Sequence, residues 1–365
     1  MIPAGALRQR AKGRRLRLAN KFLTGFLATA TLAAAAGFGS DTLVLTSTNG
    51  SANDVVVFKL QTSTTPSLSL VNMLPTGGSG GAGGATAGAV QFAGNFGAVA
   101  NYGSNNVSQL IRIGNSIVVG PSVKLAPNCM HPVSVALMAG HLFVVGSNCA
   151  ESHPWPLGIT AGSAVSLPDS SAAQIAVGET WAAVTLISGS VLQLPLNAAG
   201  SLTGASNIVT LPSDANNTPL GEAFWGDLLA FNPAHSPDSL ALVNSSRMVF
   251  PILGPQPPYP SNAPCWLAKG PGNVWYSGNS PGQAVSVFFS DGQGGVFYKS
   301  VPVPGTPTDL AVSPDRKWLA VIYTAADNSG ARVAVFSIDF RGDLTPVATS
   351  SPVGASAFHG VAFSQ

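Results

Sequence analysis

Two histidines and one glutamate are the side chains in this sequence best suited to acid–base chemistry. His131 opens the apolar run HPVSVAL, Glu222 lies in TPLGEAF, and His359 lies in AFHGVAF near the C-terminus. Imidazole and carboxyl groups can transfer protons near neutral pH when their surroundings adjust their pKa. These three residues are the candidate catalytic residues. They need structural elements that bring distant parts of the chain together.

A repeated segment supplies such elements. Seven copies align column by column, six of them with Ala in the sixth column. Their starts differ by 45, 40, 47, 45, 43 and 51 residues. A small residue at a fixed strand position suits the crowded axis of a ring. The copies are TAGAVQF (86–92), HPVSVAL (131–137), SAAQIAV (171–177), TPLGEAF (218–224), APCWLAK (263–269), TPTDLAV (306–312) and AFHGVAF (357–363).

Further apolar strands follow each copy, which gives about four strands per period, the size of one propeller blade. Charged residues make up only 9% of the chain, with 41 Gly and 28 Pro, as expected for short strands joined by turns. The sequence therefore predicts an all-β, seven-bladed propeller with four-stranded blades. A β-sandwich is the alternative, although it needs no such period.

The two ends of the predicted propeller complement each other. Residues 42–46 read as a second strand without a first, and residues 358–363 read as a first strand without a second. We expect the C-terminal strand to pair with the N-terminal blade and close the ring, which leaves no open edge.

The N-terminus resembles an export signal. Seven of the 17 basic residues lie in the first 21 positions, followed by an apolar, Ala-rich run with an A-x-A-like site at Ala34 and Ala36. We predict a signal peptide over 1–37, with an uncleaved anchor as the alternative, and one propeller over 38–365. The product would be secreted or periplasmic, without a stable membrane span.

The predicted propeller is mildly acidic. Of the 17 basic residues, 7 lie in the leader, so the propeller has 10 basic residues against 15 acidic ones. No basic stripe is present, which argues against nucleic-acid binding. We expect a monomer without cofactor or metal.

The channel mouth, where the inner strands begin, is the expected ligand site. It would bind a small molecule or a glycan. No Lys or Arg is expected there. Glu222 falls in the otherwise apolar fifth column, so the alternative is that it points into its blade. Likewise, His131 is either catalytic or a hydrogen-bonded loop histidine. Residues expected to bind substrate are Ser134, Gln174, Trp266 and Asp309.

The three cysteines divide into a pair and a single residue. A hairpin turn centred on residues 139 and 140 places Cys129 and Cys149 on facing strand positions, which suits a disulfide. Cys265 is then expected to be a small buried hydrophobe. The Gly-rich run 76–88 enters a strand rather than a helix, so we interpret it as a flexible connection between blades and not as a phosphate loop.

Three stretches resemble the seven-bladed lactonase family, which includes 6-phosphogluconolactonase and the fungal 3-carboxymuconate cyclases. They are residues 131–135, 264–268 and 306–315. The resemblance implies lactone hydrolysis or cyclisation at the mouth, with His131 matching the first His of the family's HPHS-like motif. Val133 stands where that motif has its second His. The Arg of the family's PRH-like motif and the later Glu have no counterpart.

Two functions follow from these observations. The first is a lactone hydrolase or cyclase with a largely altered catalytic set. The second is a non-catalytic extracellular propeller that binds a glycan, a cell-wall component or a protein.

Overall fold

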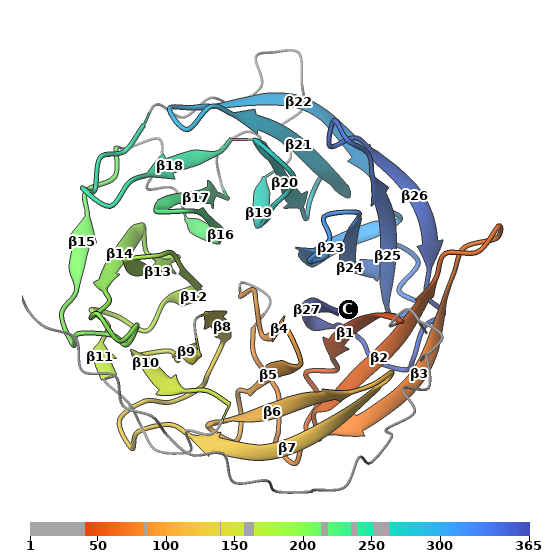
Figure 1. Ribbon diagram of the computed structural model, residues 1–365, viewed down its shortest axis with the longest axis horizontal. Helices are drawn as coiled ribbons and strands as arrows, with labels where there is room; N and C mark the ends of the chain where they lie inside the picture. Colours follow the sequence, from red (N-terminus) through yellow and green to blue (C-terminus); the bar gives the residue numbers. More distant parts are fainter. Residues whose placement is uncertain are drawn as a thin grey trace, which may run out of the picture. The chain divides into compact units, whose positions relative to one another are not determined.

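The computed structural model describes residues 41–83, 86–138, 140–156, 164–212, 218–234, 239–250 and 263–365. These residues belong to one unit of the chain, and their regular elements are all β-strands. The strands form seven separate antiparallel sheets arranged as a ring (Figure 1). The predicted leader, residues 1–37, lies outside the described residues.

The blades of the N-terminal half run outward from the channel as follows. Blade 1 is β27 (His359–Ser364), β1 (Thr42–Ser47), β2 (Asp54–Gln61) and β3 (Ser67–Pro75). Blade 2 is β4 (Val90–Ala93), β5 (Phe96–Asn101), β6 (Asn106–Ile113) and β7 (Ser116–Lys124). Blade 3 is β8 (Ser134–Met138), β9 (His141–Val145), β10 (Cys149–Pro154) and β11 (Ala164–Ser166). Blade 4 is β12 (Ala172–Val177), β13 (Trp181–Leu186), β14 (Ser190–Pro195) and β15 (Asn207–Val209).

The remaining blades follow the same order. Blade 5 has three described strands, β16 (Pro219–Trp225), β17 (Leu228–Pro233) and β18 (Ala241–Val243). Blade 6 is β19 (Pro264–Lys269), β20 (Val274–Asn279), β21 (Ala284–Ser290) and β22 (Gly295–Pro302). Blade 7 is β23 (Gly305–Val312), β24 (Trp318–Ala325), β25 (Ala331–Ile338) and β26 (Leu344–Thr349).

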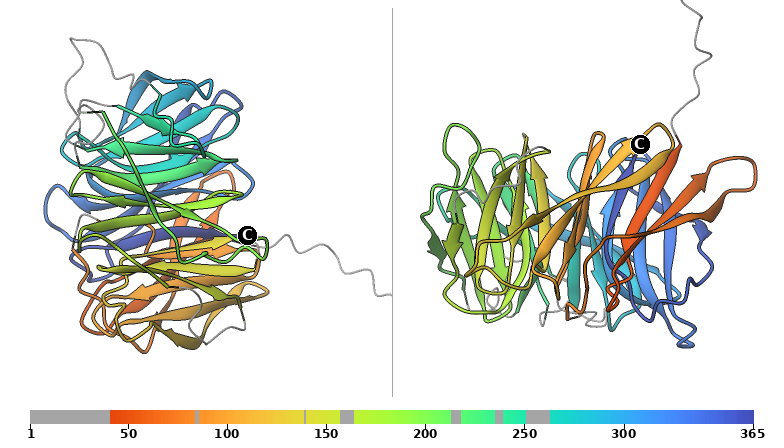
Figure 2. Two further views of the ribbon diagram at one scale, coloured as in Figure 1. Left: turned by 90° about the vertical axis from the view of Figure 1, so that its left-hand side faces the viewer. Right: turned by 90° about the horizontal axis from the view of Figure 1, so that it is seen from below.

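The seven repeat segments are the innermost strands of the seven blades, as predicted. Neighbouring inner strands contact one another around the whole ring, in the order β27, β4, β8, β12, β16, β19 and β23. Turned on edge, the unit shows the strands of successive blades standing side by side (Figure 2). The predicted seven-bladed fold is confirmed.

The predicted ring closure is also confirmed. Strand β27 pairs antiparallel with β1, with Leu43 opposite Ser364 and Thr46 opposite Val361. The Thr46 hydroxyl adds a 2.6 Å hydrogen bond to the carbonyl of Gly360. The C-terminal strand therefore completes the N-terminal blade from its inner side.

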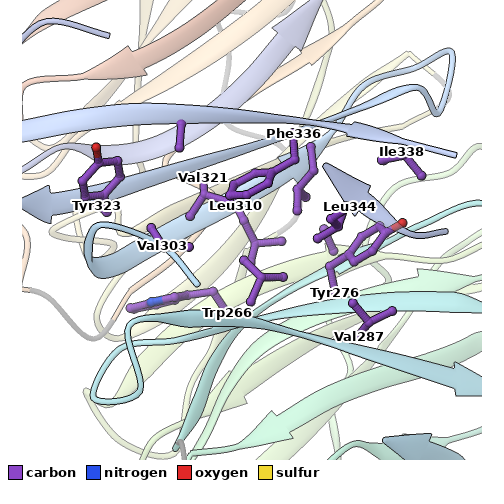
Figure 3. Packing of buried hydrophobic residues seen from close by; sticks show 14 of the residues in the cluster. Trp266, Tyr276, Val287, Val303, Leu310, Val321, Tyr323, Phe336, Ile338 and Leu344 are labelled. Carbon is purple, nitrogen blue, oxygen red and sulfur yellow. The ribbon is translucent and has the colours of Figure 1, made fainter. Parts of the chain in front are cut away.

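The core lies between blades. Because side chains alternate between the two faces of a strand, each blade buries apolar residues against both of its neighbours. Figure 3 shows one such layer, in which Trp266, Leu310 and Phe336 pack together between blades 6 and 7. Within the described part of the chain, no helix is long and apolar enough to cross a bilayer.

Candidate functional site

A cavity of about 360 Å³ lies at the axis of the ring and is lined by residues from all seven inner strands. The sixth repeat column contributes to its wall in every blade. Six of these residues are Ala, whose short side chains project little into the channel. The space at the axis therefore stays open. The column is Gln91, Ala136, Ala176, Ala223, Ala268, Ala311 and Ala362.

The end of the Gly-rich run, residues 86–88, crosses the channel where the inner strands begin. The Thr86 hydroxyl lies 2.5 Å from Nε2 of His359 in β27. The amide of Ala87 donates to Ala173 at the start of β12. The carbonyl of Gly88 accepts from Val135 in β8. These bonds reach blades 1, 3 and 4, so the segment blocks the predicted mouth.

The interpretation of run 76–88 as a flexible connection was wrong for its final residues. Thr86 and Ala87 are 8% and 2% exposed. Gly88 has φ +70°, and a Cβ atom there would lie 2.9 Å from the Ser134 hydroxyl. Glycine is required because only a residue without a side chain fits this backbone against Ser134.

Asp309 lines the cavity next to this segment. Its Oδ2 accepts a 2.8 Å hydrogen bond from the Gly88 amide, and its Oδ1 accepts one of 2.8 Å from its neighbour Leu310. Burial raises the pKa of Asp309 to about 7, while the amides of Gly88, Leu310 and Val361 oppose the rise. Near neutral pH this carboxyl can therefore both take up and release a proton.

Gln174 and Ser134 connect neighbouring inner strands. The Gln174 side chain bonds the backbone of Glu222 in both directions, at 3.0 Å to its carbonyl and 2.9 Å from its amide. The Ser134 hydroxyl accepts from the Ile175 amide at 3.3 Å. Gln174 contributes to the cavity wall, whereas Ser134 lies behind it. These side-chain hydrogen bonds connect inner strands of neighbouring blades, which belong to separate sheets and do not pair with each other through a backbone ladder.

The Glu222 carboxyl group of blade 5 is buried beside the backbone of Ala176 and Thr185 in blade 4. Both carboxyl oxygens are buried, and neither has a hydrogen-bond partner of normal geometry among the described residues. Burial raises the pKa of Glu222 well above its usual range, offset in part by the amides of Ala176 and Thr185. Burial therefore favours the protonated form of this carboxyl group, and Glu222 is one of the residues that line the cavity.

The two candidate histidines lie outside the cavity wall. His131, half-buried, stacks on Tyr102 with ring centroids 4.6 Å apart, and its amide donates to Asn105 at 2.7 Å. His359 is buried against Thr86, and burial lowers its pKa to about 4. His359 is thus neutral near pH 7 and is enclosed behind the blocking segment.

Trp266 and Cys265 also lie away from the cavity wall. Trp266 is 3% exposed in the core, and its indole donates to the Pro307 carbonyl at 3.0 Å. Cys265 is partly buried and packs against the core, and burial raises its pKa. The thiol is therefore held protonated, as an inert core cysteine requires.

Two cationic side chains line the cavity where the inner strands end. The expectation that no Lys or Arg is well placed was wrong because it considered only the beginnings of these strands. Lys269 ends β19, and its ammonium group donates to the carbonyls of Gly270, Gly272 and Val274. Arg316, in the turn after β23, is exposed, and its Nη1 donates to the Lys269 carbonyl at 2.8 Å.

These two cations differ in what they can offer a ligand. Burial, and then the charge of Arg316, lower the pKa of Lys269 to about 8. Its ammonium also lies about 5 Å from the ring centroids of Trp225 and Trp275, at 5.1 and 5.0 Å. The Lys269 donors are thus used within the protein. Arg316 bonds the carbonyls of Lys269 and Gly270 through the same Nη1, so its guanidinium is the better anion ligand.

A second hollow adjoins the cavity at Lys269 and Arg316, which line both. Its other wall includes Trp225, whose side chain is 43% exposed. An exposed indole beside a guanidinium suits a ligand with both a flat apolar face and a negative charge.

The structure thus brings together Gln174, Asp309 and the backbone of Glu222, but not the two histidines. Sequence reasoning missed Arg316. The Ala column was the available signal, since it marks the residues that face the axis. Residues that follow this column lie at the ends of the inner strands. Polar side chains there are expected to face the open end of the cavity.

Comparisons with known proteins support the fold. No family model matches the chain, and neither does any curated protein. A solved protein from Lactobacillus plantarum superposes with a TM-score of 0.69 at 15% identity, covering 89% of this chain and all (100%) of that one. A putative 6-phosphogluconolactonase from Bacteroides fragilis gives 0.62 at 12%, covering 90% and 99%. Virginiamycin B lyase from Staphylococcus aureus gives 0.56 at 14%, covering 76% and 92%. The chain shares its propeller fold with lactonase-like and lyase propellers.

Proposed function

We propose that this chain is an exported, lactonase-like propeller that hydrolyses a small lactone in the channel cavity. The observation that carries the proposal is the composition of one cavity wall, which holds both Asp309 and Arg316. Lactone hydrolysis needs a group that exchanges protons near neutral pH and a cation that stabilises negative charge. Likeness to lactonase-like propellers supports it at the level of fold only.

The proposed reaction assigns one role to each group. The Asp309 carboxylate takes a proton from a water molecule as the water attacks the lactone carbonyl. The tetrahedral intermediate collapses, and the ring oxygen leaves with the proton from Asp309. The product is a hydroxy acid, and Arg316 stabilises its developing carboxylate. The substrate enters at the ends of the inner strands, opposite residues 86–88.

A lactone screen with matched variants tests this assignment. The full chain is assayed against aliphatic, sugar-derived and muconate-derived lactones. Arg316→Gln is the key variant because Arg316 is exposed, so folding should tolerate the change. We expect turnover to fall on the order of 100-fold or more, the usual scale for removing a charge-stabilising group. His131→Ala, outside the cavity, should retain turnover.

Two outcomes would overturn the proposal. One is the absence of turnover on every lactone by folded protein. The other is turnover that survives in Arg316→Gln but disappears in His131→Ala, which would move the chemistry to the blocked mouth.

The second candidate function is binding without catalysis, and the exposed Trp225 favours it. An indole beside the cation pair can stack on the apolar face of an acidic sugar. Calorimetric titration with uronic acid oligosaccharides would detect this binding. Saturable binding lost in Trp225→Ala, together with no lactone turnover, would favour this function over hydrolysis.

A further inference from the structure

Blade 2 departs from the repeat at two positions that lie close together in the channel. Gly88 is the only glycine in the third column, and Gln91 is the only residue other than Ala in the sixth. Both residues line the cavity. Six blades build the same part of the wall with Ala, so the fold itself does not require a glutamine at position 91.

Three polar atoms surround the space in front of Gly88. The position that a Cβ atom would take there is 2.9 Å from Oγ of Ser134, 3.5 Å from Nε2 of Gln91 and 3.6 Å from Nε2 of Gln174. Because glycine has no side chain, its backbone leaves this space to other atoms. Gly88 and the two glutamines line the cavity, whereas Ser134 lies behind its wall. We call this space the Gly88 niche.

The niche has hydrogen-bond donors that the protein does not use. The amide nitrogen of Gln174 carries two protons, and one of them goes to the Glu222 carbonyl at 3.0 Å. The Gln174 amide oxygen accepts from the Glu222 backbone at 2.9 Å, which fixes the orientation of the group. The Gln91 side chain forms no hydrogen bond with any residue in the described ranges. Each glutamine thus keeps an N–H group for an acceptor atom of a ligand.

Asp309 is one hydrogen bond away from the niche. Its Oδ2 accepts from the Gly88 amide at 2.8 Å, so a proton-transfer group and the unused donors are held against the same residue. Attack of water on an ester carbonyl needs both kinds of group. One group takes the proton of the water, and fixed donors stabilise the negative charge that develops on the carbonyl oxygen.

We propose that Gln91 and Gln174 form the oxyanion site of the lactone hydrolysis proposed above, with the carbonyl oxygen of the substrate in the Gly88 niche. The reaction assigned to the niche rests on that proposed function. Water adds to the carbonyl carbon, its proton passes to Asp309, and an electron pair of the double bond moves to the oxygen that the two amides hold. When the double bond re-forms, the ring C–O bond breaks and the leaving oxygen takes the proton from Asp309. The acid product then loses its own proton to solvent, and Arg316 faces the resulting carboxylate.

Gln91→Ala tests the oxyanion site without disturbing the fold, because six blades already have Ala at this position. For any lactone that the full chain hydrolyses, we expect kcat to fall about 100-fold or more while KM changes little, since the donor acts on the transition state. Gln91→Glu keeps the size of the side chain but replaces the donor by an acceptor, so it should lose at least as much. Gln61→Ala, exposed at the end of β2, is the matched control and should keep full turnover.

A binding measurement tests the niche without relying on turnover. The probe is a six-membered cyclic phosphonate, whose tetrahedral anionic group resembles the intermediate of lactone hydrolysis. Calorimetric titration of the full chain should give saturable binding that is weakened at least about 10-fold in Gln91→Ala and is unchanged in Gln61→Ala. Arg316 is intact in all three proteins, and circular dichroism confirms that each is folded.

The outcomes separate the oxyanion site from the proposed hydrolysis. Phosphonate binding that depends on Gln91, together with no turnover of any lactone, would support the niche and overturn only the hydrolysis. Lactone turnover that is unchanged in Gln91→Ala would overturn the oxyanion site and leave the hydrolysis in place. Equal phosphonate affinity in the wild type and Gln91→Ala, or no phosphonate binding by the folded wild type, would also overturn it.

Discussion

The carboxylate of Asp309 in blade 7 accepts a 2.8 Å hydrogen bond from the amide of Gly88 in the segment that enters blade 2. Blade 1 lies between them, so this bond spans the blade that the C-terminal strand completes. One side chain thus holds the blocking segment in the channel and also faces the cavity.

Gly88→Ala should destabilise the propeller more than Gly77→Ala does. Both glycines have similar left-handed φ, +70° and +74°, but a Cβ at Gly88 would lie 2.9 Å from the Ser134 hydroxyl, and one at Gly77 meets nothing within 4 Å. The clash should add about 1–3 kcal/mol to the shared backbone cost. Urea unfolding measures the difference. Equal losses in the two variants would show that the channel can make room for the methyl group.

Asp309→Asn should change how stability depends on pH. The folded-state pKa of Asp309 is raised from 3.8 to about 7, so its contribution to stability is full below pH 4 and is lost as pH rises to about 7. The full change is about 4 kcal/mol by linkage. The free energy of unfolding of the wild type, minus that of the variant, should fall across this range. Asp291→Asn, in an exposed turn, serves as the control for the amide substitution itself.

His359→Gln should reveal a dependence of opposite sign. Burial lowers the folded-state pKa of His359 from 6.5 to about 4, so its contribution is full above pH 6.5 and is lost as pH falls to about 4. The expected change is about 3 kcal/mol. Between about pH 4 and 7 the contributions of Asp309 and His359 to the free energy of unfolding change in opposite directions. The wild-type curve alone therefore cannot separate them, and the difference between wild type and each single variant is needed. A flat curve for His359→Gln would mean that the imidazole is hydrated in the folded state.

Reduction of the Cys129–Cys149 disulfide should lower the free energy of unfolding by about 2–4 kcal/mol. Their Cα atoms lie 5.3 Å apart, and the bond closes a segment with a sequence separation of 20. Peptide mapping without reductant should recover the two cysteines in one linked fragment. Recovery of Cys265 in a linked fragment instead would contradict the assignment. Cys265→Ser should not change the effect of reduction.

The repeat by itself determined the fold of this protein. Ala in the sixth column at a spacing of 40 to 51 residues requires seven equivalent strands around an axis, and the incomplete ends 42–46 and 358–363 require ring closure. The predicted Cys129–Cys149 disulfide is also present, although Cys149 is the first residue of β10 and does not belong to β9, the strand that faces β8. These inferences hold because they depend on strand period and register, which are properties of local sequence.

Only the tertiary structure decided where the cavity opens. Residues 86–88 carry no pattern that indicates a channel plug, because their bonds go to His359, Ala173 and Asp309, far away in sequence. The same segment turns the expected mouth into a closed end and leaves Arg316, in a turn, at the open one. The pKa values of Glu222, Asp309 and His359 depend on burial between blades, and burial is set by packing that no local segment specifies.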